Sequence, residues 1–203
     1  SSSDTSSVIV GGSSNSIDAL HAVSVGGANN TNNGLLSVVV GGLDNANSAS
    51  QAFLGGGNAN NVSGSNAVVV GGNMNTVSGI GAVIVGGENN NADGQMVFIG
   101  AGELHVASGK YGAIVSGTQS KLVGFAAAIV GGSWNTASIF GSVTGGYSNT
   151  ATGTYATIVG GRANTALVED STVVGGNSHN AAGDSSTIGG GFRNSALGEF
   201  SLI

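Results

Sequence analysis

The 203-residue sequence contains no cysteine and no proline, and only 7% of its residues are charged. The absence of cysteine excludes a disulfide framework and is compatible with either redox compartment. The charged fraction is far below the ~25% of an average soluble domain, but 40% of the residues are hydrophobic. The chain can therefore bury a core and does not have the composition of a disordered segment.

Positively charged residues are especially scarce in this sequence. Residues 1–109 contain neither Lys nor Arg, and the four cations are Lys110, Lys121, Arg162 and Arg193. Such a chain can neutralise few phosphates, so we expect neither nucleic-acid binding nor attraction to an anionic membrane. No run of about 18 apolar residues occurs, so we expect no membrane span and no direct membrane contact.

What the sequence has instead is an internal repeat of 15 residues, marked by a recurring pair of glycines. The pairs begin at Gly11, Gly26, Gly41, Gly56, Gly71, Gly86, Gly131, Gly145, Gly160, Gly175 and Gly190. Degenerate copies at Ala101-Gly102 and Ser116-Gly117 fill the gap, and one step, from Gly131 to Gly145, is 14 residues long. An aliphatic residue stands two positions before each pair, with Ser24 as the exception. A small or apolar residue, and then usually a second glycine, follow farther along each repeat.

The repeat predicts the fold. Short β-branched runs such as Ala67-Val68-Val69-Val70 are bounded by glycine and are typical of strands. The unit is too short for a propeller blade or a helical repeat but suits one turn of a β-helix. We therefore predict an all-β parallel β-helix, a β-solenoid of about thirteen coils in a single domain over residues 1–203. The glycine pair, the recurrent Asn and the second glycine are expected at corners with unusual backbone angles.

An asparagine column follows the glycine pairs. Because coils stack about 4.8 Å apart, these side chains are expected to form a structural hydrogen-bonded ladder. The ladder comprises Asn15, Asn30, Asn45, Asn60, Asn75, Asn90, Asn135, Asn149, Asn164 and Asn194. His105 and His179 replace Asn in this column, and we interpret them as structural substitutions. The alternative is that an oligomer gathers copies of these histidines into a metal-binding or pH-sensitive cluster.

Each coil can enclose only a few small side chains, and so narrow a core is marginal alone. The use of Ala, Ser and Gly beside the aliphatic column favours close packing against other copies. We expect a homotrimer of parallel solenoids. The strand runs are apolar on both sides, as in Val38-Val39-Val40, so which side faces the coil interior stays open at this stage.

The repeats resemble the heads of trimeric autotransporter adhesins (the YadA-like head). The resemblance is carried by segments such as Asn66-Ala67-Val68-Val69-Val70-Gly71 and Gly141-Ser142-Val143-Thr144-Gly145, and it covers essentially the whole chain. It implies a trimer of left-handed parallel β-rolls on a bacterial surface, binding host cells, matrix proteins or glycans. The repeat of that family is about one residue shorter, and the second glycine and regular Asn are departures. Related repeats in phage and viral fibres make a tail or capsid fibre the alternative, so the expected location is extracellular, on a cell or virion.

Variable residues occupy the turns. Trp134, Tyr147 and Tyr155 are the candidate ligand-binding residues, because large aromatics dominate contact energy at interfaces. The competing interpretation is tolerated surface variation. No Ser–His–Asp or Cys–His arrangement stands out, so we expect no catalytic residue, no enzyme activity, no cofactor and no metal site.

Ice binding is a third function to weigh, since it uses flat, weakly charged arrays of aligned threonines. Thr157, Thr172 and Thr187 form one short rank. Thr31, Thr76, Thr136, Thr150 and Thr165 occupy another column, interrupted by Ala46, Val106 and Lys121. Finally, Ser201-Leu202-Ile203 falls at a strand position of the next coil, so we expect further coils or another domain to continue the fibre.

Overall fold

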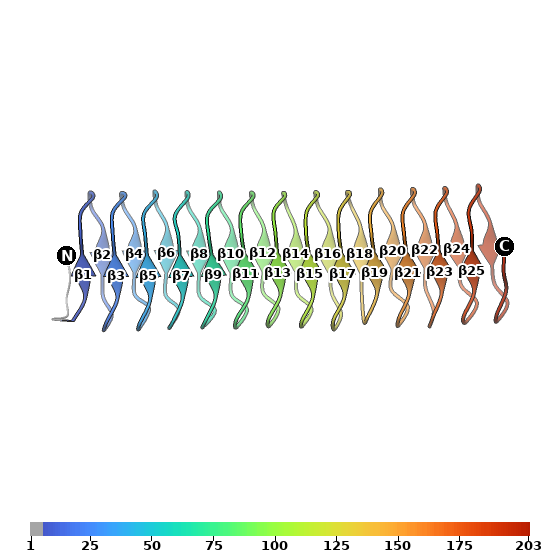
Figure 1. Cartoon of the computed structure of the whole chain (residues 1–203), viewed down its shortest axis with the longest axis horizontal. Coiled ribbons are helices and arrows are strands. Elements are labelled where there is room, and N and C mark those ends of the chain that lie inside the picture. Colours follow the sequence, from blue (N-terminus) through green and yellow to red (C-terminus); the bar gives the residue numbers. More distant parts are fainter. Residues whose placement is uncertain (1–5) are drawn as a thin grey trace. The chain divides into compact units, whose positions relative to one another are not determined.

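A computed structural model describes residues 6–203 (Figure 1). The described part of the chain is all-β, with 26 strands of two residues each and no helix. Strands occur twice in each repeat, so about thirteen coils are formed and the predicted β-solenoid is confirmed. The chain divides into two compact units, with the boundary between Leu104 and His105. A single domain over residues 1–203 stays a prediction, as does the left-handed sense of the coils.

In the first unit, up to Leu104, each coil contributes one strand to an odd-numbered and one to an even-numbered parallel sheet. The odd-strand sheet contains β1 (Val8–Ile9), β3 (Val23–Ser24), β5 (Val38–Val39), β7 (Phe53–Leu54), β9 (Val68–Val69), β11 (Val83–Ile84) and β13 (Phe98–Ile99). The even-strand sheet contains β2 (Ser16–Ile17), β4 (Thr31–Asn32), β6 (Ala46–Asn47), β8 (Asn61–Val62), β10 (Thr76–Val77) and β12 (Asn91–Ala92).

The second unit, from His105, has the same two sheets. Its odd-strand sheet contains β15 (Ala113–Ile114), β17 (Ala128–Ile129), β19 (Ser142–Val143), β21 (Thr157–Ile158), β23 (Thr172–Val173) and β25 (Thr187–Ile188). Its even-strand sheet contains β14 (Val106–Ala107), β16 (Lys121–Leu122), β18 (Thr136–Ala137), β20 (Thr150–Ala151), β22 (Thr165–Ala166), β24 (Asn180–Ala181) and β26 (Ser195–Ala196).

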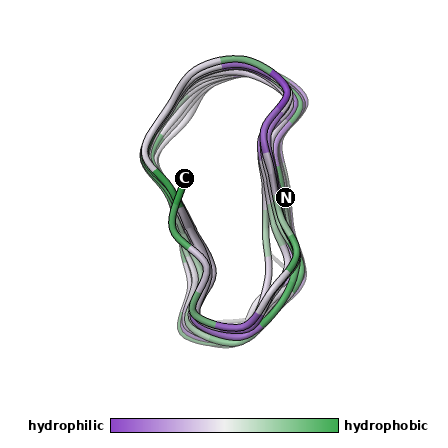
Figure 2. Ribbon diagram, turned by 90° about the vertical axis from the view of Figure 1, so that its right-hand side faces the viewer, coloured by the Kyte–Doolittle hydropathy of each residue, from purple (hydrophilic) through white to green (hydrophobic). Residues whose placement is uncertain are grey.

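Neighbouring strands pair at equivalent positions of the repeat, for example Val68 with Val83 and Thr76 with Asn91. In each coil the first turn carries the glycine pair and leads from the odd to the even strand. The second turn leads from the even strand to the next odd strand. Viewed along the stack, each coil is an elongated loop closed by these turns (Figure 2).

The core is a set of inward columns, and the structure decides the inside and outside of each strand. In the odd strands the second residue points inward: Val69 and Ile84 are fully buried, whereas Val68 and Val83 are only partly covered. Val77 and Ala82 supply two further inward columns. This alternation follows from the pleat of a strand, which points successive side chains to opposite faces.

The turns correct part of the sequence-based expectation about unusual backbone angles. The ladder asparagines do not adopt the left-handed conformation; the residue before each of them does, as at Met74 with φ of 52°. The second glycine of the pair is also left-handed, as at Gly72 with φ of 100°. Gly79, in the second turn, has no positive φ and is required for another reason. A Cβ atom there would collide with the carbonyl oxygen of Gly94 in the next coil.

Left-handed residues other than glycine occur in both turns, and their hydrogen bonds explain why they are tolerated. Most backbone N–H groups that link the coils donate to the following coil, as that of Val68 does to the carbonyl of Ala82 at 2.9 Å. The N–H of Met74 instead donates backward, to the carbonyl of Asn58 at 2.9 Å. These backward bonds offset the roughly 1–2 kcal/mol that a left-handed residue with a Cβ costs.

The 14-residue coil loses its residue in the second turn. The inward residue Gly141 follows the inward residue Ala137 by four positions in the sequence. In the preceding coil, Ala127 follows Leu122 by five positions. Phe140 still donates its N–H to the preceding coil, to the carbonyl of Phe125 at 2.7 Å. Both sheets therefore keep their register through the deletion, because turns can change length without changing strand pairing.

Candidate functional site

The asparagine column lies inside the coils and links each coil to both neighbours. The side-chain N–H₂ of Asn60 donates to Asn45 Oδ1 at 3.2 Å, to the carbonyl of Gly56 at 3.0 Å and to that of Gly72 at 3.0 Å. The backbone N–H of Asn60 also donates to Asn45 Oδ1, at 2.9 Å. The Asn60 amide thus bonds to a side chain of the preceding coil and to backbone carbonyls of its own and the following coil, which adds to the hydrogen bonding of the buried turns.

The same pattern recurs along the column. Nine of the ten ladder asparagines are buried, at 7% exposure or less, and Asn194 is partly exposed. In the second unit the backbone N–H of Asn149 donates to Asn135 Oδ1 at 2.9 Å, and that of Asn164 to Asn149 Oδ1 at 3.1 Å. The ladder is therefore a structural feature of both units and is closed to ligands.

The two ladder histidines also point inward. His105 and His179 are 0% and 1% exposed. Their Nδ1 atoms accept from the backbone N–H of Ser120 at 3.2 Å and of Asn194 at 3.1 Å, as the Asn Oδ1 does elsewhere. Their burial inside the coils favours the interpretation as structural substitutions over a cluster shared between chains.

A second buried polar cluster, which the sequence analysis missed, lies in the first unit. Asn47 donates its side-chain N–H₂ to Asn32 Oδ1 at 2.8 Å, and Ser37 donates its hydroxyl to the same oxygen at 2.6 Å. Ser24 is buried on the neighbouring odd strand. The available signal was that Ser24 interrupts the aliphatic column, and Asn32 and Asn47 interrupt the small or apolar column. The cluster is enclosed by the core and offers nothing to solvent.

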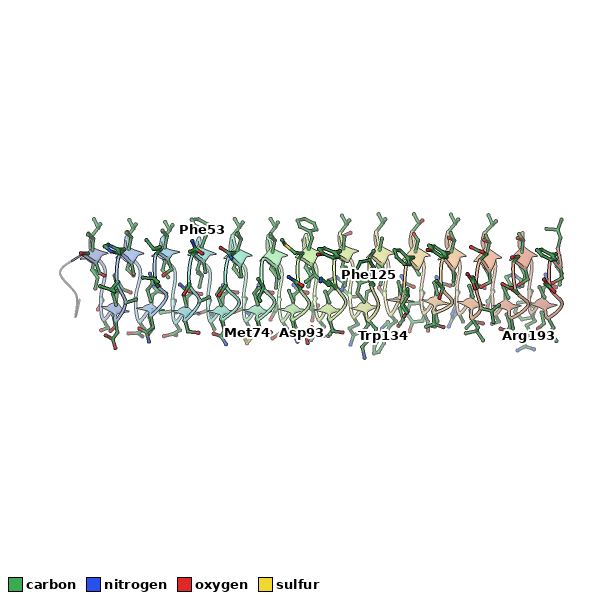
Figure 3. All side chains as sticks on the ribbon, turned by 90° about the horizontal axis from the view of Figure 1, so that it is seen from below. Phe53, Met74, Asp93, Phe125, Trp134 and Arg193 are labelled. Atoms are coloured by element: carbon green, nitrogen blue, oxygen red, sulfur yellow. The ribbon has the colours of Figure 1, made fainter. Side chains whose placement is uncertain are left out.

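The three predicted ligand-binding residues are exposed but do not share one surface. Trp134 and Tyr147 lie in first turns and are 52% and 48% exposed, whereas Tyr155 lies in a second turn and is 51% exposed. The guanidinium of Arg162 lies 5.7 Å from the Tyr147 ring centroid. Trp134, in a first turn, and Phe125, in a second turn, are both labelled in Figure 3. The binding role of the three residues stays a prediction.

Tyr155 belongs to a different group, an aromatic run along the second turns of the second unit. The rings of Tyr111 and Phe125 lie 5.3 Å apart, those of Phe125 and Phe140 5.4 Å, and those of Phe140 and Tyr155 4.9 Å. All four are exposed, between 40% and 51%. The sequence hid this run because Phe125 stands one turn position earlier than the others and the 14-residue coil interrupts the period.

All four acidic residues of the second unit continue the same row of turns. Glu169 and Asp170 lie in the coil after Tyr155, Asp184 in the next and Glu199 in the one after that. The turns are joined by the N–H of Asp170 donating to Thr154 and that of Ser185 donating to Glu169, both at 3.0 Å. All four side chains are exposed, and none forms an ion pair with another residue in the described range 6–203.

The outward side of the odd-strand sheet in the first unit is an apolar face. It consists of one rank on the strands and one rank two residues later. The strand rank is Val8, Val23, Val38, Phe53, Val68, Val83 and Phe98, and the second rank includes Val10, Val25, Val40, Val70 and Val85. We call these residues the valine face. The outward strand residues of the even-strand sheet are polar apart from Ala46: Ser16, Thr31, Asn61, Thr76 and Asn91.

Larger residues in the strand rank of the valine face are matched by smaller residues in the second rank. Where Phe53 replaces valine in the strand rank, Gly55 replaces valine in the second rank, and Phe98 is followed by Gly100 in the same way. The Phe53 ring reaches over Gly55, because a Cβ atom there would lie 3.1 Å from a ring carbon. Figure 3 shows Phe53 on one side of the ribbon and Met74 on the other.

The two threonine ranks lie on different sheets. Thr157, Thr172 and Thr187 point outward from the odd-strand sheet, in register with one another. Thr136, Thr150 and Thr165 point outward from the even-strand sheet. They therefore do not combine into one array of two adjacent ranks.

Among residues 6–203, no group of three or more His, Cys, Asp or Glu side chains is placed to hold a metal ion. Within the same range no helix is long and apolar enough to cross a membrane. No protein-family model and no curated protein matches the chain. The fold alone defines its class, a repetitive parallel β-solenoid with exposed apolar and aromatic surfaces.

Proposed function

We propose that this chain is a non-enzymatic structural segment of an extracellular fibre, which assembles as a homotrimer and presents its turns for adhesion. The β-solenoid is compatible with this role, because stacked coils make an extended scaffold whose turns can vary freely. The resemblance to trimeric adhesin heads adds to the proposal, and a phage or viral fibre is the alternative owner of such a segment.

The observation that carries the proposal is the valine face. It is uncharged, and Val10, Val70 and Val85 are 67%, 50% and 43% exposed. Contiguous apolar patches on soluble proteins commonly mark sites of association. The compensated Phe53 and Gly55 pair limits the bulk that the larger ring adds to this face.

A second copy of the same chain suits such a face. Its valines repeat at the coil spacing of about 4.8 Å, so an identical rank from another copy has the matching period. Interdigitation of identical ranks is the mode by which stacked β structures form dry interfaces. The even-strand sheet offers no comparable apolar rank, since its outward residues are mainly Ser, Thr and Asn.

Light scattering coupled to size exclusion tests the assembly. We expect a mass near three chains for the unchanged protein. The double variant Val70→Lys and Val85→Lys should lower this mass to that of one chain, because it places two charges on the valine face. The matched control is Ser63→Lys and Ser78→Lys, which adds the same charges on the outward side of the even-strand sheet and should leave the mass unchanged. A monomeric unchanged protein would refute the assembly, as would equal masses for both double variants.

Ice binding is the second candidate, favoured by the register of Thr157, Thr172 and Thr187 on one sheet. A thermal hysteresis measurement separates it from the fibre role. We expect no hysteresis, since the second threonine rank lies on the other sheet. Hysteresis that disappears on replacing Thr172 by Tyr would establish ice binding instead.

A further inference from the structure

We infer that the second turns of the second unit form a docking ridge for an extended polypeptide that is apolar at one end and positively charged at the other. The ridge comprises the aromatic run of Tyr111, Phe125, Phe140 and Tyr155, followed by Glu169, Asp170, Asp184 and Glu199. The inference goes beyond the proposed fibre role and needs only that these turns remain accessible in the assembly.

The aromatic part of the ridge offers ring surface to a partner. The four rings contact one another in succession, which stabilises the stacking of their turns, yet 40–51% of each residue stays exposed. Ile139, in the same row, is 45% exposed. Aromatic side chains at this exposure are typical anchors for apolar groups and, through their π faces, for cations.

The acidic part gives the ridge its charge preference. Four exposed carboxylates lie in three successive coils, and they are all the acidic residues of the second unit. No ion pair with any residue of the described chain neutralises them. Their mutual repulsion disfavours the free ridge and is relieved when a cationic partner binds.

The charges also set the direction of the partner. Lys110 stands at the other end of the ridge, with its ammonium 5.0 Å from the Tyr111 ring centroid. A cationic segment is repelled there and attracted at Glu199, so the apolar end of the partner lies near Tyr111 and the basic end near Glu199.

The length of the ridge sets the length of the partner. Tyr111 and Phe200 are separated by six coil steps, which at about 4.8 Å each span about 29 Å. An extended strand rises about 3.3 Å per residue, so the ridge accommodates about nine residues. A single cation or a short apolar ligand would use only part of it.

Fluorescence anisotropy with synthetic nonapeptides tests the ridge on the full chain. The probe alternates leucine and threonine over five residues and carries three arginines in the last four, and a second probe has the reverse order. Two control peptides replace the arginines by glutamate or the leucines by threonine. We expect at least one arginine–leucine peptide to bind, each control to bind at least about tenfold more weakly, and the affinity to fall as salt rises from 0.02 to about 0.3 M.

Two variants assign the binding to the ridge. E169Q/D170N/D184N/E199Q removes the charge while keeping side-chain shape, and Phe125→Thr with Phe140→Asn removes ring surface, with Asn chosen because Phe140 is left-handed at φ of 52°. Each should weaken binding by about tenfold or more. E88Q/E103Q, which neutralises two acids in first turns of the first unit, is the matched control and should bind like the unchanged chain.

Several outcomes would overturn the inference: no binding of either arginine–leucine peptide at millimolar concentration, equal binding of the glutamate peptide, or equal weakening by E88Q/E103Q. Binding of spermine as tight as that of the peptides, with no effect of the aromatic variant, would also overturn it by showing a site for charge alone. Light scattering on the same samples reports the oligomer separately. A lost trimer with intact peptide binding would refute only the fibre proposal, and the reverse result only the ridge.

Discussion

The side-chain amide of Asn75 donates to the side-chain oxygen of Asn60 at 3.1 Å, although 15 residues separate the two along the chain. The side-chain oxygen of Asn75 in turn accepts from the backbone N–H of Asn90 at 3.0 Å. This relationship makes each coil depend on the coils on either side, because a single buried amide bonds to a side chain of the preceding coil and to the backbone of the following one.

Replacing Asn75 by Leu should therefore lower the free energy of unfolding by about 1–3 kcal/mol, since it removes the side-chain hydrogen bonds to Asn60 Oδ1, to the carbonyl of Gly87 and to the backbone N–H of Asn90. Backbone strain does not add to this cost, because Asn75 is not in the left-handed conformation. Thermal or urea denaturation measures it. The control Asn61→Leu lies on the outward side of β8 and should change stability much less. Equal effects of the two substitutions would show that the ladder contributes little.

His179 leaves the ladder incomplete. Its Nδ1 accepts from Asn194, but its buried Nε2 has no partner, where an Asn would donate to the glycine carbonyls. His179→Asn should raise the free energy of unfolding by about 0.5–1.5 kcal/mol. Circular dichroism melting of both proteins provides the measurement. An unchanged or lower midpoint would mean that the imidazole packs well enough to offset the missing bond.

The buried pair of Asn32 and Asn47 should respond differently to one and to two substitutions. Asn32→Val alone leaves the amide of Asn47 and the hydroxyl of Ser37 with one bond fewer, at a cost of about 1–3 kcal/mol. Asn32→Val combined with Asn47→Val and Ser37→Ala removes all three groups and should recover only part of that loss, because the bond from the N–H of Ala49 to Asn47 Oδ1 is newly broken. Urea unfolding of the single and triple variants gives the comparison. A triple variant less stable than the single one would argue against this view of the cluster.

The left-handed residues should be improved by glycine. Ala59 has φ of 53°, and Ala59→Gly should raise the free energy of unfolding by up to about 1 kcal/mol through relief of this strain. Ala46, on β6, has no positive φ, and Ala46→Gly should lower it by about 0.5–1 kcal/mol. Opposite signs in the two melting curves are the expected result, and a loss of stability in both variants would contradict it.

Much of the architecture could be read from the period of the glycine pairs. A repeat of 15 residues with β-branched runs and no helix-compatible segment leaves few alternatives to a β-solenoid. The recurrence of Asn at one position indicated a ladder, because stacking at a fixed period brings equivalent side chains together. The backbone role assigned to these asparagines was wrong, since a composition argument does not tell which of two adjacent turn residues becomes left-handed.

The candidate sites depended on the tertiary structure. Val68, Val69 and Val70 are equally apolar, so only the pleat of β9 shows that Val69 is core and that Val68 and Val70 belong to the valine face. Tyr155 was grouped with Trp134 and Tyr147 because all three are aromatic residues in variable turns, whereas its ring contacts Phe140.

The sequence by itself thus determined the solenoid, its period and the existence of the Asn column, because these follow from repetition along the chain. Only the tertiary structure decided which side of each strand is exposed and that the second unit's aromatic rings and carboxylates occupy one row of turns. The physical reason is that these groupings run across the coils. The grouped residues lie 14 to 16 positions apart along the chain and do not always hold the same position in the turn, as Phe125 and Phe140 show. Only the stacking of the coils brings such residues into contact.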